Sequence, residues 1–339
     1  MVKMKNILSL ILSATFLSGC YFPAEQQPTT GELSVHFLDV GQADSALLIS
    51  DGDAMLIDGG NADDSRLIYS YLQDVGIDSL DYIIATHPHE DHTGGLSAAL
   101  EACDVEKIYI ADAKSDAAFY EKFLLKAEDM GAELAYAENG EEFSLGSSEV
   151  TLYVPEGIDK DNLNNTSITA RVECGDVAFL FTGDAEREAE EALLNSGADL
   201  RANVLKAPHH GSDSSSTYPF LREVNPEYIV ISVGEDNSYG HPHKEVLSRY
   251  SDLGAEVYRT DRSGHIVMVT DGSSITVSTS KENDKPEEES EITYIGNKKS
   301  KKFHLPTCTS LPKEENRIYF DYLSDAIKMG YAPCKGCNP

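Results

Sequence analysis

The sequence predicts an α/β protein in which two β-sheets pack together as a sandwich. Short apolar stretches typical of strands alternate with stretches of helical periodicity, and the strands fall into two groups. The chain of 339 residues is long enough for one large core domain and a smaller unit. The strongest polar motifs stand directly after predicted strands, where a rigid strand can hold the side chains of a loop in place.

The first part of the domain shows alternating and apolar runs separated by a turn at Asp51-Gly52-Asp53. After these runs, leucine, isoleucine and tyrosine recur at helical spacing until Gly76 ends the pattern. A short apolar run then precedes the first motif. We therefore expect strands at 33–38, 46–50, 54–58 and 82–85, and a helix at 63–75.

The most informative stretch follows the strand at 82–85 and reads T-H-P-H-E-D-H-T-G-G. It places three imidazoles and one carboxylate within six residues: His87, His89, Asp91 and His92. Neutral imidazole and carboxylate are good ligands for Zn²⁺ and related divalent metals, and four of them exceed what one open catalytic zinc needs. The spacing predicts two adjacent metals, with His87 and His89 on one and Asp91 and His92 on the other.

Strands and helices continue to alternate beyond this loop, as a sandwich of two sheets requires. The expected strands are 107–110, 133–136, 150–154, 168–173, 177–181, 204–207, 229–233, 257–258, 264–269 and 275–277. The expected helices are 117–130, 186–195 and one that begins at Lys244.

The H-x-H-x-D-H stretch resembles the signature of the metallo-β-lactamase superfamily. This resemblance implies a four-layer αββα sandwich with a one- or two-metal site at its edge. Asp58, at a strand end before two glycines, matches the first motif of that superfamily, which implies that it orients a ligand histidine. Thr182-Gly183-Asp184 also follows a strand, and the resemblance implies that Asp184 bridges both metals.

The motif P-H-H-G-S after the strand at 204–207 supplies further candidates. We expect His209 to be the last ligand of the second metal and His210 to face substrate or support a ligand, although the two roles can be exchanged. Ser212 and the backbone amides around Gly211 are suited to hold a phosphate oxygen.

Two further motifs narrow the resemblance to the extracellular domain of the ComEC competence family. They are D-V-G-Q-A-D-S at 39–45 and G-H-P at 240–242. The resemblance implies that Gln42 and Asp44 lie near the metal edge, as supporting groups or substrate contacts. It places His241 at the rim of the site, where a histidine can protonate a leaving oxygen or bind a phosphate.

The stretch N-N-T-S at 164–167 fits the same family and stands where many superfamily members carry a metal-binding histidine. Asn164 and Asn165 are therefore candidates for metal or substrate contact. Because an amide oxygen is a weaker ligand than imidazole, we expect the His87/His89 metal to be loosely held, with Zn²⁺ and Mn²⁺ both open.

The N-terminus reads as a bacterial lipoprotein signal peptide at 1–19. Lysines precede a short apolar run, and L-S-G-C resembles a lipobox whose Cys20 would carry lipid. An ordinary secretory signal with a chance cysteine is the alternative. Residues 20–31, rich in Gln, Pro and Thr, read as a tether. We therefore expect an extracytoplasmic protein that is anchored to a membrane through lipid on Cys20.

The charge is distributed unevenly along the chain. The formal net charge of −31 argues for a soluble surface and against tight non-specific binding of nucleic acid. The hydrolase domain at 32–280 is followed by an acidic linker at 281–291. The last segment, 292–339, has eight Lys and Arg against four Asp and Glu, so a small basic module ends the chain.

This module combines H-x-x-x-C with a later C-K-G-C. So small a unit usually needs a disulfide or a bound metal for stability. His304, Cys308, Cys334 and Cys337 have the composition of a closed structural zinc site. A Cys334–Cys337 disulfide is the alternative. The segment resembles the zinc-binding domain of the DNA-repair protein Ada, which has cysteine at the position of His304.

The sequence thus predicts a metal-dependent hydrolase with two divalent metals at the active site, Zn²⁺ or Mn²⁺, and one structural zinc. The ComEC resemblance implies a phosphodiesterase or nuclease that acts on DNA, with Asp91, His210 and His241 in catalysis. Hydrolysis of a small ester, such as a lactone or phosphorylcholine ester, is an alternative. A non-catalytic, membrane-tethered nucleic-acid-binding protein is another. Any role in DNA uptake needs separate partners, and the sequence predicts no oligomeric state.

Overall fold

The computed structural model describes residues 31–281, 294–306, 308–320 and 323–336. The predicted signal peptide, Cys20 and the tether up to residue 30 lie outside these described residues, and so do residues 282–291 of the predicted linker and Cys337. Two large sheets of eight and seven strands form the main domain, and a four-stranded sheet forms the C-terminal module.

The first large sheet contains the strand that carries the histidine loop. Its order is β15-β14-β1-β2-β3-β4-β5-β6, with β4 in parallel pairing between β3 and β5. The strands are β1 (Leu33–Phe37), β2 (Ala46–Ser50), β3 (Asp53–Ile57), β4 (Ser79–Ala85), β5 (Asp104–Ile110), β6 (Glu133–Tyr136), β14 (Ile266–Thr270) and β15 (Ile275–Thr279).

The second large sheet has the order β13-β12-β11-β10-β9-β8-β7. Its strands are β7 (Glu141–Leu145), β8 (Ser148–Tyr153), β9 (Thr169–Cys174), β10 (Val177–Phe181), β11 (Val204–Lys206), β12 (Tyr228–Ile231) and β13 (Glu256–Arg259). Strands β10, β11 and β12 pair in parallel, so their carboxyl ends reach the same edge.

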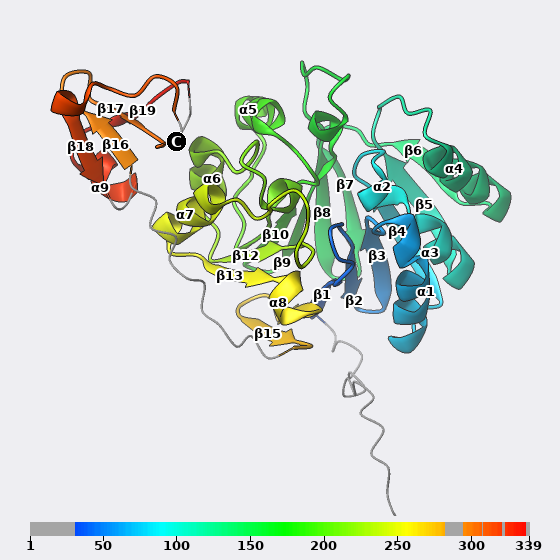
Figure 1. Cartoon of the computed structure of the whole chain (residues 1–339). Coiled ribbons are helices and arrows are strands. Elements are labelled where there is room, and N and C mark those ends of the chain that lie inside the picture. Colours follow the sequence, from blue (N-terminus) through cyan, green and yellow to red (C-terminus); the bar gives the residue numbers. More distant parts are fainter. Residues whose placement is uncertain (1–30, 282–293, 307, 321–322, 337–339) are drawn as a thin grey trace, which may run out of the picture.

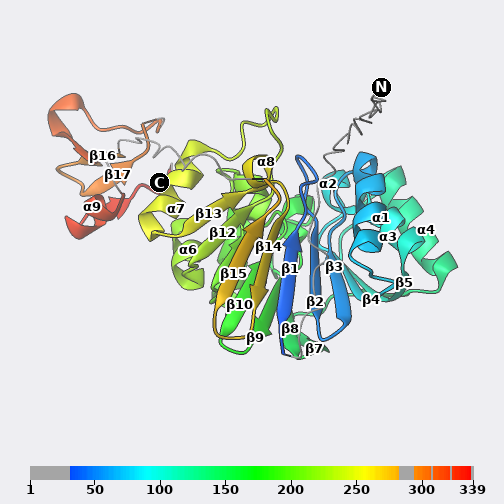
Figure 2. The ribbon, with the colours of Figure 1, turned by 90° about the horizontal axis from the view of Figure 1, so that it is seen from below.

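Helices cover the outer face of each sheet (Figures 1 and 2). The first sheet carries α1 (Ser65–Asp74), α2 (Glu90–Thr93), α3 (Leu96–Ala102) and α4 (Ala118–Met130). The second carries α5 (Arg187–Ser196), α6 (Tyr218–Val224) and α7 (Lys244–Leu253), with the short α8 (Thr260–Ser263) after β13. One buried apolar cluster fills the space between the sheets and one lies under each helical layer. The predicted αββα sandwich is confirmed.

Strand β7 and helix α6 are among the elements that were not predicted from the sequence. Strand β7 carries Glu141 and Glu142 and lies at the edge of its sheet, where charged side chains reach solvent. Helix α6 has only seven residues with a proline in its first turn, too few to show a periodic pattern. The helix expected at 63–75 begins instead with a 3₁₀ turn at Ala62–Asp64, because Asn61 and Asp64 form a capping box there.

The C-terminal module consists of β16 (Tyr294–Asn297), β17 (Lys302–His304), β18 (Arg317–Phe320), β19 (Ala332–Pro333) and α9 (Leu323–Lys328). It lies beside α6 and α7 (Figure 1). Tyr218 of α6 packs against the module's own apolar cluster, and the Ser248 hydroxyl of α7 lies 3.0 Å from the Tyr294 hydroxyl. The module is thus in direct contact with the sandwich.

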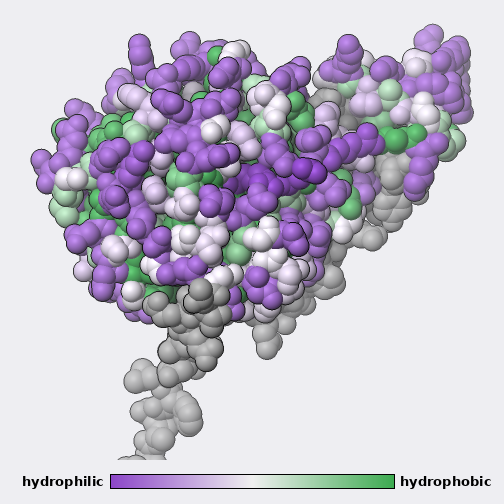
Figure 3. Space-filling model, turned by 180° about the vertical axis from the view of Figure 1, so that it is seen from behind, coloured by the Kyte–Doolittle hydropathy of each residue, from purple (hydrophilic) through white to green (hydrophobic). Residues whose placement is uncertain are grey.

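The surface is mainly hydrophilic on the face shown in Figure 3, with hydrophobic residues in small separate patches. The large exposed hydrophobic residues of the described chain are scattered over several elements, among them Tyr69, Leu125 and Tyr319. Within the described ranges, the helices are all too short or too polar to cross a bilayer.

Candidate metal centre

The histidine loop is held between β4 and the turn that follows β3. His87 and His92 are almost completely buried, and His89 precedes the short helix α2. Two glycines make the close packing possible, since a Cβ atom on Gly95 would lie 2.1 Å from the carbonyl oxygen of Gly59. The loop is therefore fixed by backbone packing, and its ligands do not depend on a flexible surface segment.

Two groups of candidate ligands meet at Asp184, which directly follows β10 and Gly183. His87 and His89 form one group with Asp184. Asp91, His92 and His210 form the other group with the same carboxylate. In each group the candidate ligand atoms lie within 4.8 Å of one another.

The two carboxylate oxygens of Asp184 face different groups. Its Oδ1 atom lies 3.2 Å from Nε2 of His92 and 3.6 Å from Nε2 of His210. Its Oδ2 atom lies 3.9 Å from Nε2 of His87. This is the arrangement that the predicted bridging role requires.

The donor set fits divalent cations because imidazole nitrogens and carboxylate oxygens converge on Asp184, and in the neutral rings their lone pairs face one another. Nδ1 of His92 donates to Asp58 at 2.7 Å, so in the neutral ring Nε2 is an acceptor. That Nε2 atom and Oδ1 of Asp184 are both buried and lack a hydrogen-bond partner within the described chain. Nδ1 of His210 likewise faces the carbonyl oxygen of Ser232 at 3.0 Å, which turns its Nε2 toward Asp91 at 3.2 Å. A bound cation would satisfy these acceptors.

The pKa values of the ligand side chains also favour bound cations at this centre. Burial disfavours a charged Asp184, but His92 and His210 hold the pKa of its carboxyl well below the usual range. Burial likewise opposes a charge on His210, yet Asp184 and Asp44 raise its pKa to about 10. The pKa of His87 falls well below the usual value because of burial and the neighbouring His92. The carboxylates thus stabilise positive charge at the metal centre. Bound cations can supply this charge in place of protons.

Asp58 and Asp44 hold the ligand histidines from behind. Asp58 accepts hydrogen bonds from the Thr86 backbone amide at 2.9 Å and from its hydroxyl at 2.8 Å, in addition to His92. Asp44 lies 3.1 Å from Nδ1 of His210. Both carboxylates are buried, as expected of groups that orient ligand rings.

The sequence left the last ligand of the second metal open between His209 and His210, with His209 preferred, and the geometry favours His210. His210 belongs to the second group, whereas His209 turns its Nδ1 toward Ser214 at 3.1 Å and Glu186 at 3.4 Å. Both residues have positive φ angles, 49° and 53°, so the chain turns sharply between them. This turn directs the two adjacent rings to different oxygens of Asp184, with Nε2 of His209 3.6 Å from Oδ2 and Nε2 of His210 3.6 Å from Oδ1.

The two asparagines differ in their surroundings. The Asn165 side chain is buried and fully engaged, since its oxygen accepts from the Glu186 and Ala189 amides and its amide donates to Glu188. It ties the turn to α5 and does not face the ligand groups. Asn164 lines the cavity at the metal centre, and its buried Oδ1 has no hydrogen-bond partner within the described chain. Of the two, only Asn164 is placed to contact a metal or substrate.

A cavity of about 520 Å³ opens onto the centre and is lined by Asp91, Asp184 and His210. Gln42 and His241 form part of its rim, with Nε2 of Gln42 3.4 Å from Nδ1 of His241. Burial and the neighbouring His243 lower the pKa of His241 to about 4, so its ring is neutral at pH 7. The low pKa favours hydrogen bonding to a phosphate over proton donation, and both predicted roles of His241 stay predictions.

Ser212 does not reach this cavity. Its buried hydroxyl lies 3.0 Å from that of Ser214. The expected contact of Ser212 with a phosphate oxygen therefore stays a prediction.

Sequence reasoning missed three supporting residues. Lys206 is buried at the end of β11 and donates to Asp44 at 2.6 Å, and a lysine within an apolar strand was its signal. The Ser167 hydroxyl accepts a hydrogen bond from the Asp184 backbone amide at 3.0 Å and lies 3.3 Å from Nδ1 of His87. Glu186 pairs with His209, and that hydrogen bond lowers its pKa to about 2.

A third candidate metal group lies in the C-terminal module. His304, Cys308 and Cys334 are buried and place their ligand atoms within 4.8 Å of one another, with Nδ1 of His304 3.3 Å from the Cys308 sulfur. These are three of the four predicted zinc ligands, and Cys337 lies outside the described residues. The donor set of one imidazole and two sulfurs fits zinc.

The fold and the donor groups define a class of protein, and comparison with known families gives the same answer. The Metallo-beta-lactamase superfamily matches residues 38–235, more than half of the chain, and the chain belongs to that superfamily. The Metal binding domain of Ada matches residues 283–339. The family and the C-terminal domain implied by the sequence motifs are confirmed, and the chain is a metal-dependent hydrolase of this superfamily.

The similar proteins include competence proteins. Competence protein ComA of Neisseria gonorrhoeae is 34% identical over 259 residues, which cover 76% of this chain and 34% of that protein. ComE operon protein 3 of Bacillus subtilis (strain 168) is 29% identical over 255 residues, covering 70% of this chain and 33% of that protein. The chain spans about a third of the length of these relatives.

Solved structures of the same fold are also similar. The metallo-beta-lactamase fold protein YhfI from Bacillus subtilis is 16% identical with a TM-score of 0.48, covering 70% of this chain and 100% of that one.

Proposed function

We propose that this chain is an extracytoplasmic, membrane-anchored phosphodiesterase that cleaves DNA at a centre of two divalent metals. The observation that carries the proposal is the placement of Asp184, whose two oxygens face two separate donor groups beside an open cavity. Two-metal sites of this kind serve the in-line displacement of phosphate esters.

Each residue has a distinct part in this proposal. His87 and His89 would hold one cation, Asp91, His92 and His210 would hold the other, and Asp184 would contribute to both. Divalent cations held in this way supply Lewis acidity, which lowers the pKa of water and balances charge on the phosphate oxygens. Counting Asp184 in each, the group with His87 and His89 offers three donors and the group with Asp91, His92 and His210 offers four. We therefore expect the first cation to exchange more readily.

The rim residues act on the substrate. Asn164, with its unpartnered oxygen, is a candidate contact to the first cation or to substrate. The His241 ring is neutral at pH 7, and because its Nδ1 faces the amide nitrogen of Gln42, its Nε2–H can donate a hydrogen bond to substrate. Asp91 lines the cavity and is the more exposed of the two acidic ligands. The proton for the leaving oxygen then comes from solvent in the open cavity.

The choice of DNA rests on the relatives and on charge. Competence protein ComA of Neisseria gonorrhoeae and Recombination protein 2 of Haemophilus influenzae are named for competence and recombination, and both processes handle DNA. The body of the chain is acidic, while residues 292–339 carry a positive excess of four charges, eight minus four. DNA would therefore approach through the cations and the C-terminal module.

Localisation follows from the sequence motif. Lipid on Cys20 would anchor the protein outside the cytoplasm. In the C-terminal module, the remaining zinc ligand would be Cys337. Any uptake of DNA would depend on separate membrane partners.

The test is cleavage of single- and double-stranded DNA by the purified protein with Mn²⁺ or Zn²⁺, compared with Asp184→Asn. Asp199→Asn is a matched control, because Asp199 is partly exposed and pairs with Arg201. We expect cleavage by the wild type and the control and none by Asp184→Asn. No cleavage by the wild type, or hydrolysis of a lactone or phosphorylcholine ester instead, would contradict the proposal.

A further inference from the structure

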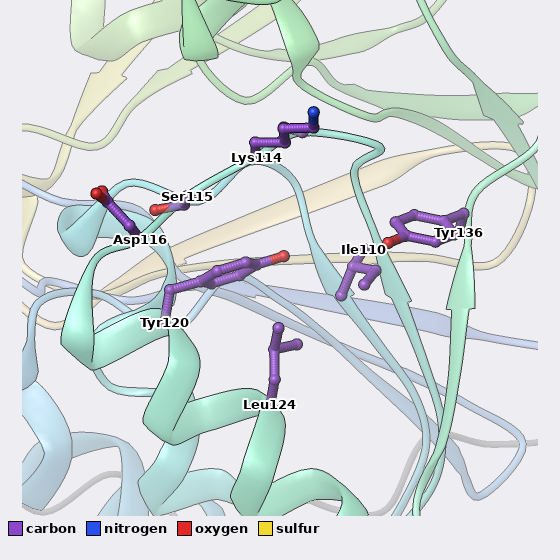
Figure 4. Close-up of a pocket in the computed structure, with 8 residues that line it drawn as sticks. Ile110, Lys114, Ser115, Asp116, Tyr120, Leu124 and Tyr136 are labelled. Atoms are coloured by element: carbon purple, nitrogen blue, oxygen red, sulfur yellow. The ribbon is translucent and has the colours of Figure 1, made fainter.

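A second cavity, of about 460 Å³, lies next to the metal centre and has no part in holding the metals. It is formed by α4, the end of β5, the loop that joins them and the end of β6. Figure 4 shows Tyr120 and Leu124 projecting from α4, Ile110 and Tyr136 on the strand side, and Lys114 on the loop above. The volume is within the range of small-ligand sites.

The two cavities are neighbours along one loop. Ser115 and Asp116 line both of them, and Ala117 and Phe119 continue the wall of the metal-site cavity. A ligand with a phosphate at the metal centre can therefore pass over Ser115 and Asp116 and place its next group in the second cavity.

The second cavity combines aromatic and apolar walls with a polar rim. The Tyr120 ring is buried, whereas Tyr136 is 60% exposed and presents its ring to solvent. Exposed Lys114 puts a positive charge on the loop, and Asp116 and Ser115 offer acceptors for N–H groups. A flat ring with polar edges matches this combination, because it can stack on tyrosine and bond to the rim.

We propose that this pocket of Ile110, Lys114, Tyr120, Leu124 and Tyr136 binds a nucleobase next to the phosphate that is cleaved. The proposal rests on the proposed phosphodiesterase function. Lys114 and Asp116 give the lining one charge of each sign, so the cationic head of a phosphorylcholine ester, which also suits tyrosine rings, is the competing occupant that the titration below tests. The pocket thus adds a contact to the base beside the phosphate, and because every base has a flat face, it selects for nucleotides without reading sequence.

The test uses the absence of tryptophan from the whole chain. Tyr136→Trp in the full chain introduces a single tryptophan at the pocket, and Tyr319→Trp, at an exposed tyrosine of β18, is the matched control. Both are titrated with thymidine 5′-monophosphate, deoxyribose 5-phosphate, phosphorylcholine and octanoate. We expect saturable quenching of Tyr136→Trp by the nucleotide alone, and no saturable change in Tyr319→Trp.

Equal responses to deoxyribose phosphate, phosphorylcholine or octanoate, or no saturable response at all, would overturn the pocket assignment. A second measurement is the KM for oligonucleotide cleavage. We expect Tyr136→Ala to raise KM about tenfold and Tyr136→Phe, which keeps the ring, to leave it near the wild-type value. If the wild type does not cleave DNA, the proposed function fails, and the fluorescence titration still decides whether the pocket binds a nucleotide.

Discussion

The two metal-binding regions of this chain differ in what holds their ligands. The centre at the sheet edge draws its ligands from loops after β4, β10 and β11, which are anchored in a sandwich with three apolar clusters. The His304–Cys308–Cys334 group belongs to a module whose described core has six buried residues, Tyr294, Phe303, Leu305, Phe320, Ala326 and Tyr331. In the first region the folded sandwich would position the metals. In the second, metal binding would contribute a large part of the free energy of folding.

The largest effect that follows from this comparison is on the C-terminal module. Structural zinc in small domains contributes an apparent binding free energy of about 10–16 kcal/mol, so Cys334→Ser should unfold the module. We expect this variant to lose one equivalent of zinc by elemental analysis and to be cut by protease within residues 294–336. Hydrolysis of a small phosphodiester at the sandwich should persist.

Cys103→Ser is the control, because Cys103 is buried in the sandwich far from the ligand group in sequence. Its zinc content should equal that of the wild type. A Cys334→Ser variant that keeps its zinc and its protease resistance would show that the module folds without metal.

The next largest effect distinguishes the two adjacent histidines of the metal centre. Because His210 belongs to the second ligand group and His209 does not, His210→Ala should lower phosphodiester cleavage by about 100-fold or more. His209→Ala should lower it by less than about tenfold, because His209 belongs to neither ligand group at Asp184. Metal content and initial rates measured side by side check this, and equal losses would contradict the assignment of the second group.

A smaller effect is expected from the residues behind the ligands. Asp58→Asn keeps the shape of the side chain and suits the positive φ of 57° at this position, but removes the charge that orients His92. Loss of such a partner weakens metal affinity by about 10–100-fold. Isothermal titration with Zn²⁺ measures the change, with exposed Asp63→Asn as the control. Unchanged affinity in Asp58→Asn would mean that the loop alone positions His92.

The sequence predicted those parts of the site that depend on residue type and on position after a strand. Five predicted ligands lie together in the structure: His87, His89, Asp91, His92 and Asp184. They could be predicted because short apolar runs marked the strands before them, and the carboxyl ends of such strands share an edge. The grouping of the first four into two pairs also followed from their spacing alone.

The choice between His209 and His210 did not follow from the sequence, because it depends on two consecutive left-handed backbone conformations. Asn165 resembled Asn164 in sequence, but its amide is engaged by the first turn of α5, a tertiary contact without a local signal. Lys206 lay within an apolar strand, and only the fold shows the buried carboxylate of Asp44 that accepts it.

The central claim is that the sandwich holds a preformed two-metal centre that performs hydrolysis. The direct measurement is DNA cleavage by one preparation before chelation, after chelation and after addition of Mn²⁺ or Zn²⁺, with the thermal transition of the sandwich followed in parallel. We expect chelation to abolish cleavage while the sandwich stays folded, and added metal to restore activity. Cleavage that persists in the metal-free protein, or that returns equally in Asp184→Asn, would contradict the account.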